Sequence, residues 1–103
     1  MELVGVRNIT CVNNQTLDFE IEEGNILKVL NVSHQGNPAS ISSFSTKLNN
    51  EYIYYTKARD TYGAISFVHT NFPFYLSEGI HELHTGSNYS STLYCLEFKL
   101  TTP

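Results

Sequence analysis

Histidines and a neighbouring glutamate are the residues of this chain whose types could form a metal site. His81, Glu82 and His84 lie close together, and His34 and His69 are the remaining histidines. On a strand, successive side chains point to opposite faces, so ligands of one metal must be an even number of residues apart. His81 and His84 therefore point to opposite faces. Only Glu82 and His84 share a face, and no spacing motif supplies a third ligand. We expect no bound metal, and we expect solvated or loop histidines.

The candidate nucleophiles and carboxylates of the chain do not indicate a catalytic site either. The chain is rich in serine but has no Gly-x-Ser-x-Gly sequence, and Cys95 stands in an apolar segment, where a thiol is usually inert. A glycosidase needs two carboxyl groups that face each other. Asp18, Glu20 and Glu22 instead alternate along one segment, which is typical of a solvated face. We therefore predict a protein that is not an enzyme and carries no cofactor.

The low charge and the lack of long apolar runs disfavour several classes of partner. Only 16% of the 103 residues are charged, the formal net charge is −4, and Lys and Arg form no run. Nucleic-acid binding depends on basic patches, so we expect no nucleic-acid partner. The sequence has no long apolar run that could act as a secretory signal or a membrane span. We expect the protein to begin at or near Met1, to be made in a cytoplasm and to bind no membrane.

Hydrophobic alternation predicts the elements that position these residues. Leu17, Phe19 and Ile21 alternate with acidic residues, which is the period of a half-buried strand. Similar short segments, bounded by Gly, Asn, Pro or Ser, recur along the chain. We predict strands over 3–12 (one strand or two), 16–22, 26–33, 41–48, 51–57, 64–70, 80–85 and 92–100. The pattern indicates an all-β fold: a single domain over 1–103, built as one antiparallel, jelly-roll-like β-sandwich of about eight short strands.

The same alternation gives a predicted core. We place eight apolar side chains in it: Leu17, Phe19, Ile21, Leu27, Val29, Phe67, Leu96 and Phe98. The segment 26–33 begins apolar on both faces, which predicts a central strand that is covered on both sides. Tight turns are expected at 23–25 and 49–50, where Gly and Asn tolerate positive φ. Cys11 and Cys95 are expected to be two buried thiols, with a disulfide as the alternative.

Aromatic residues are the strongest indication of a binding surface. The chain has seven Tyr and six Phe but no Trp. In a regular strand over 51–57, Tyr52 and Tyr54 would share one face, and Tyr55 would join Ile53 on the other. One of these faces must be core. The other face could be a sugar platform, a protein contact or simply cross-strand aromatic packing.

Two predicted loops carry further aromatic side chains. The segments 58–63 and 71–79 contain Tyr62, Phe72, Phe74 and Tyr75, which is more apolar surface than the loops of a monomer need. We predict a partner-binding surface made by Tyr52, Tyr54, Tyr62, Phe72, Phe74 and Tyr75. The alternative is that Phe72 and Phe74 fold back and close the end of the sandwich. Low charge and exposed aromatics together predict a homo-oligomer, or many copies on a larger assembly.

The segment 67–100 has an order of turns and strands that resembles a known group of proteins. A Phe-Pro pair at 72–73 is followed by apolar residues, a polar pair, Gly79, a short strand, a Gly-Ser loop and a final strand containing Glu97 and Phe98. This order is similar to the C-terminal part of small jelly-roll domains of bacteriophage virion proteins, which decorate capsids or form head fibres and tail appendages.

The resemblance implies a non-enzymatic structural component of a virion. Its partners would be copies of itself and a neighbouring coat or fibre protein, and it would be assembled in the cytoplasm of the host bacterium. The alternative that the residues leave open is a carbohydrate-binding β-sandwich module that recognises a cell-surface glycan.

Overall fold

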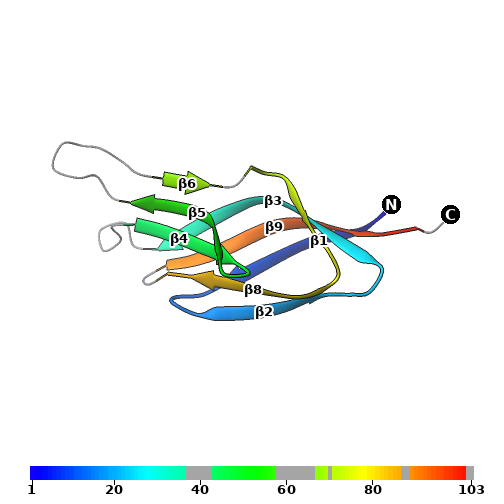
Figure 1. Ribbon diagram of the computed structural model, residues 1–103, viewed down its shortest axis with the longest axis horizontal. Helices are drawn as coiled ribbons and strands as arrows, with labels where there is room; N and C mark the ends of the chain where they lie inside the picture. The colour runs from blue at the N-terminus through cyan, green and yellow to red at the C-terminus, as the bar shows by residue number, and fades with distance from the viewer. Residues whose placement is uncertain (37–42, 58–66, 70, 87–88, 102–103) are drawn as a thin grey trace.

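In the computed structural model, residues 1–36, 43–57, 67–69, 71–86 and 89–101 are described, and they form nine strands and no helix. The strands are β1 (Glu2–Cys11), β2 (Thr16–Ile21), β3 (Asn25–Gly36), β4 (Ser43–Leu48), β5 (Glu51–Lys57), β6 (Phe67–His69), β7 (Phe74–Leu76), β8 (Gly79–Thr85) and β9 (Tyr89–Lys99). They run roughly along the long axis of the molecule (Figure 1). This confirms the all-β prediction. The segment 71–79, which the sequence predicted to be a loop, contains the short strand β7.

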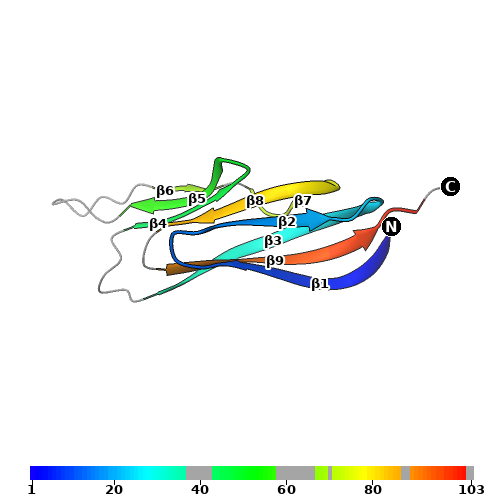
Figure 2. The ribbon, with the colours of Figure 1, turned by 90° about the horizontal axis from the view of Figure 1, so that it is seen from below.

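The strands form two antiparallel sheets that pack face to face. The four-stranded sheet has the order β1-β9-β3-β7, and the five-stranded sheet has the order β2-β8-β4-β5-β6. Figure 2 shows them edge-on as two layers. The pairs β1 with β9, β2 with β8, β3 with β7 and β4 with β5 are nested along the chain. The fold is therefore one long hairpin rolled into two sheets, which is the arrangement of a jelly roll.

Two tight turns form where the sequence predicts them. At the turn between β2 and β3, Gly24 has a φ of 86°, and the Asn25 amide donates to the Glu22 carbonyl at 3.0 Å. Between β4 and β5, Asn49 and Asn50 have φ values of 52° and 66°. Positive φ at both central residues is the requirement of the two-residue hairpin turn that matches strand twist.

The core lies between the sheets and confirms half of the predicted list. Buried apolar residues come from seven of the strands: Ile9, Cys11, Phe19, Ile21, Leu27, Val29, Val32, Leu48, Ile53, Leu83, Leu93 and Cys95. Phe19, Ile21, Leu27 and Val29 are among them. Cys11 and Cys95 are both buried and free, so the prediction of two thiols is correct. Burial raises the pKa of the Cys95 thiol to about 11, which keeps it protonated and unreactive.

Leu17 is the first correction to the predicted core. It faces the core side of β2 but remains 37% exposed. β2 is an edge strand of the five-stranded sheet, so Leu17 has a strand neighbour on one side only. For Phe67, the prediction falls on a side chain outside the part of the chain that the structure describes.

The second correction concerns β9, where the prediction took the wrong face. Leu93 and Cys95 point into the core, whereas Leu96 and Phe98 lie on the outer face and are only half-buried. Both faces of β9 are apolar, so alternation alone could not distinguish them. On the core side this strand also carries Ser91, which has no exposed surface.

The prediction that Tyr52 and Tyr54 share one face of β5 is wrong, because the strand contains a bulge. The register between β4 and β5 shifts by one residue at Ile53: Thr46 pairs with Tyr54, and Lys47 pairs with Tyr52. A bulge places two successive side chains on the same side of the strand. Ile53 and Tyr54 therefore both face the core, and Tyr52 and Tyr55 both lie on the outer face with ring centroids 5.4 Å apart.

A chain of buried polar side chains links the two sheets at one end of the core. His34 Nε2 lies 2.7 Å from Thr46 Oγ1, which lies 2.8 Å from Ser91 Oγ; Ser91 Oγ in turn lies 2.6 Å from Thr85 Oγ1. These residues come from β3, β4, β9 and β8 in turn. Because each buried hydroxyl has a partner, the network fixes the packing of the sheets without an unsatisfied polar group.

Candidate interaction surface

The residues predicted to form a partner-binding surface do not come together in one place. Tyr52 and Tyr75 are each 49% exposed, but Tyr52 lies on the outer face of the five-stranded sheet and Tyr75 on the outer face of the four-stranded sheet. Tyr54 packs against the core, with its ring centroid 4.7 Å from that of His34. Tyr62 lies outside the described residues.

The two phenylalanines of the 71–79 segment also pack against the core. Phe72 and Phe74 are half-buried, and their ring centroids are 5.4 Å apart. Phe74 faces inward from β7, where it pairs with Val29 of β3. Their position corresponds to the alternative in which these side chains close the sandwich. Of the six predicted residues, Tyr52 and Tyr75 are the two whose described side chains are largely exposed.

The outer face of the four-stranded sheet carries a larger apolar surface, which sequence reasoning missed. Side chains that alternate with buried core residues must point away from the core. Eight apolar or aromatic ones do so towards the end of the sandwich where β1 begins and β9 ends. This apolar face comprises Leu3 and Val6 of β1, Ile26 and Leu30 of β3, Tyr75 of β7, and Tyr94, Leu96 and Phe98 of β9.

Strand register makes the apolar face continuous. In one row, Phe98 of β9 lies between Leu3 of β1 and Ile26 of β3. In the next row, Leu96 lies between Val6 and Lys28, and Lys28 is followed by Tyr75 of β7. Directly paired side chains on one face of a sheet are in contact range. The first row therefore crosses three strands, and the second crosses all four.

The apolar face is exposed to solvent. Val6 is 74% exposed and Leu3 is 56% exposed. Lys28 is the charged residue within the two rows, and its ammonium group lies 5.9 Å from the centroid of the Tyr75 ring. A cation placed over an aromatic ring is attracted by the ring's negative face, so this charge is compatible with its aromatic neighbour.

The other half of the same outer face is polar. Thr10 and Thr92 face each other with their hydroxyl oxygens 2.9 Å apart, and the Ser33 hydroxyl lies 3.0 Å from the Tyr94 hydroxyl. The outer face of the five-stranded sheet is also polar, since Asp18, Glu20 and other charged residues occupy it. Ile80, Tyr52 and Tyr55 add some apolar surface to that second face, but the larger set of apolar side chains in register lies on one half of the four-stranded sheet.

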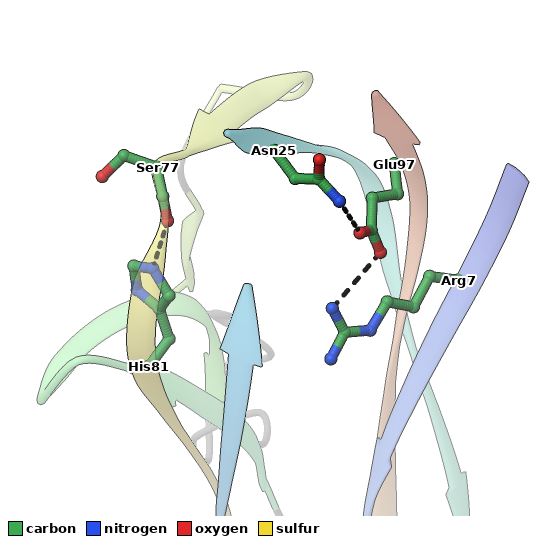
Figure 3. A network of polar contacts seen from close by, with 5 residues as sticks. All are labelled: Arg7, Asn25, Ser77, His81 and Glu97. Atoms are coloured by element: carbon green, nitrogen blue, oxygen red, sulfur yellow. Dashed lines mark hydrogen bonds and ion pairs between the residues drawn. The ribbon is translucent and has the colours of Figure 1, made fainter. Parts of the chain in front are cut away.

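A polar cluster on the inner side of the four-stranded sheet links the three strands that carry most of the apolar face. Arg7 Nη1 of β1 lies 3.3 Å from Glu97 Oε1 of β9, and Asn25 Nδ2 of β3 donates to Glu97 Oε2 at 2.7 Å (Figure 3). The Arg7 guanidinium also lies 5.9 Å from the centroid of the Phe19 ring, across the sandwich. Glu97 sits between Leu96 and Phe98 in sequence, so this cluster joins the three strands directly behind them.

His81 and His84 lie on opposite faces of β8. His81 faces the core side, where its ring stacks on Phe19 at 5.7 Å, and its Nε2 lies 2.8 Å from the Ser77 carbonyl oxygen (Figure 3). His84 is on the opposite face, with Nδ1 at 3.0 Å from Thr16 Oγ1. The two histidines therefore diverge, as their spacing predicts. Across the described ranges, no group of three or more His, Cys, Asp or Glu side chains could hold a metal ion.

Comparisons with known proteins do not assign the chain to a group. Protein-family models, curated proteins and solved structures were compared with it, and none of the three gives a match. None of the residues whose placement is described belongs to a helix long and apolar enough to cross a membrane.

Proposed function

We propose that this protein is a non-enzymatic structural component of a bacteriophage virion that works through protein–protein contacts. In this proposal the apolar face packs against copies of the same chain, and the assembled copies contact a neighbouring coat or fibre protein. The protein decorates the capsid or forms part of a head or tail appendage. The placement in a virion is supported by the turn and strand order of residues 67–100.

The observation that carries the contact proposal is the exposed apolar face. Strands that are apolar on both sides are normally covered on both sides. β3 and β9 are such strands, yet the described part of the chain covers only their inner faces. A second layer of protein over Ile26, Leu96 and Phe98 would complete the burial that their sequence indicates.

The size of the apolar face fits the centre of a stable interface. A covered aliphatic side chain hides on the order of 100 Å² of apolar area. Eight such side chains at their observed exposures amount to several hundred Å², which is as much as soluble monomers usually expose in one patch. A standard interface buries about 800 Å² on each partner. The polar half of the same sheet face, around Thr10, would supply the rim.

Particle association is the experiment that tests the proposal. Purified protein is mixed with particles of the phage whose coat and tail genes neighbour the gene, and the mixture is separated on a density gradient. We expect the parent protein to sediment with the particles and Tyr75→Ala to do so much less. A parent protein that stays at the top of the gradient, and that is absent from purified virions by mass spectrometry, would contradict the placement.

A further inference from the structure

The outer face of the five-stranded sheet carries a second set of side chains in register. Thr16 of β2 pairs with His84 of β8, His84 pairs with Lys47 of β4, and Lys47 pairs with Tyr52 of β5. The row therefore crosses four strands on one face. It consists of a hydroxyl, an imidazole, an ammonium group and an aromatic ring.

This row borders a hollow in the surface. The hollow has a volume of about 220 Å³ and is lined by Thr16, Lys47, Asn50, Glu82 and His84. All five side chains are polar, and together they offer both hydrogen-bond donors and acceptors. The lining comes from three strands and from the turn between β4 and β5.

Hydrogen bonds hold the walls of the hollow in place. The backbone N–H of Asn49 donates to the backbone carbonyl of Glu82 at 2.8 Å. In return, the backbone N–H of Glu82 donates to the side-chain oxygen Oδ1 of Asn49 at 2.9 Å. These two bonds tie the turn that carries Asn50 to β8. Thr16 fixes the His84 ring through the 3.0 Å contact with Nδ1. These bonds fix the backbone at Glu82 and the His84 ring, which lowers the conformational entropy that this part of the site loses when a ligand binds.

The aromatic ring of Tyr52 does not line the hollow itself but lies against Lys47, which does. Because of the bulge at Ile53, Tyr52 and Tyr55 both lie on this face, with their rings at 64° to each other. The ammonium group of Lys47, which lines the hollow, lies 4.8 Å from the centroid of the Tyr52 ring. Tyr52 keeps about half of its surface exposed to solvent.

We propose that this hollow binds one neutral sugar unit of a glycan. A sugar needs donors and acceptors for its hydroxyl groups and an apolar surface for its C–H groups, and Lys47, Glu82 and Asn50 with Tyr52 supply both. The volume lies below the roughly 300–1,000 Å³ of sites for larger ligands, which fits a single ring. Asp18 and Glu20 project from the same sheet face and disfavour an anionic ligand. The site is independent of the proposed virion contact, because it lies on the other sheet.

Titration of isotope-labelled protein with two neutral saccharides, maltotriose and diacetylchitobiose, tests this proposal by NMR. We expect one of them to shift the amide signals of Thr16, Lys47, Asn50 and Tyr52 in a saturable way below about 10 mM. Tyr52→Ala and Glu82→Gln should each weaken that binding by about tenfold or more. Tyr75→Ala, which removes a tyrosine of equal exposure from the other sheet, should bind as the parent does.

Two results would overturn the sugar site. One is the absence of amide shifts with both saccharides. The other is binding that neither Tyr52→Ala nor Glu82→Gln weakens. The amide spectrum of each variant shows whether it is folded, and Glu82→Gln keeps the shape of the side chain if Tyr52→Ala perturbs the sheet. A variant that disrupts the apolar face should keep sugar binding, so failure of one proposal is distinguishable from failure of the other.

Discussion

His34 is a titratable side chain that the fold holds between the two sheets. Its ring lies against Tyr54 and Tyr89, and its Nε2 shares a hydrogen bond with Thr46. Burial lowers the pKa of His34 from its ordinary value of 6.5 to about 4. The unfolded chain therefore binds a proton more readily than the folded protein between these two pH values.

Acidification should destabilise the protein through this residue. Because the pKa of His34 is lower in the folded state, stability is fully present above about pH 6.5 and is lost as the pH falls towards 4. The loss amounts to at most roughly 3 kcal/mol in the free energy of unfolding. Urea unfolding at several pH values measures it. His34→Gln should flatten the curve over this range. Equal pH dependence in the parent and His34→Gln would contradict this account.

Buried and half-exposed leucines on paired strands should differ in their contribution to stability. Leu83 has no exposed surface, and its partner in the register, Leu17, is 37% exposed. Leu83→Ala leaves a cavity and should lower the free energy of unfolding by about 2–5 kcal/mol. Leu17→Ala should cost on the order of 1 kcal/mol because water can fill the space. Chemical denaturation of both variants tests this. Equal losses in the free energy of unfolding would contradict the assignment of Leu83 to the core and Leu17 to its edge.

At the level of elements, strand positions were predictable but two strand faces were not. Regular alternation located β2 to within one residue and put Phe19 and Ile21 in the core. β9 is apolar on both sides, so its pattern fits either orientation and Leu96 was assigned to the wrong face. Only pairing with β1 and β3, which depends on the whole fold, decides between them.

The aromatic surface was hard to predict for a related physical reason. A bulge adds one residue to a strand and reverses the faces beyond it, and the sequence around Ile53 carries no Gly or Pro that would mark it. Composition predicted an excess of exposed aromatic surface, but of the described predicted residues only Tyr52 and Tyr75 are largely exposed. It did not reveal that Tyr54 and Phe74 would pack inward while the outer face of β3 and β9 stayed uncovered.

Two tyrosines on different elements should therefore respond in opposite ways to truncation. Tyr75 projects outward from β7, so Tyr75→Ala should weaken self-association while the thermal midpoint stays within a few degrees of the parent. Tyr54 packs on the core, so Tyr54→Ala should lower the midpoint by ten degrees or more, from a loss of roughly 3 kcal/mol. Differential scanning fluorimetry and light scattering separate the two effects. The reverse pattern would place Tyr54 at the interface instead.

At the level of the whole molecule, the two sheets present unlike outer surfaces. One half of the four-stranded sheet is apolar, and the five-stranded sheet carries acidic and other polar side chains together with Ile80, Tyr52 and Tyr55. If the apolar face packs against other copies, the five-stranded sheet points away from that contact. The proposed sugar hollow would then remain open to solvent on the outside of the assembly.

Sedimentation velocity of the parent protein and two matched variants tests the central claim most directly. Val6→Glu places a charge on the β1 edge of the apolar face, beside Leu96, and Thr10→Glu places the same charge on the same strand in its polar half. Both positions are exposed, so neither change should disturb the fold. We predict that the parent and Thr10→Glu are oligomers at about 100 μM and that Val6→Glu is a monomer. A monomeric parent, or a Val6→Glu variant that associates as fully as the parent, would contradict the account.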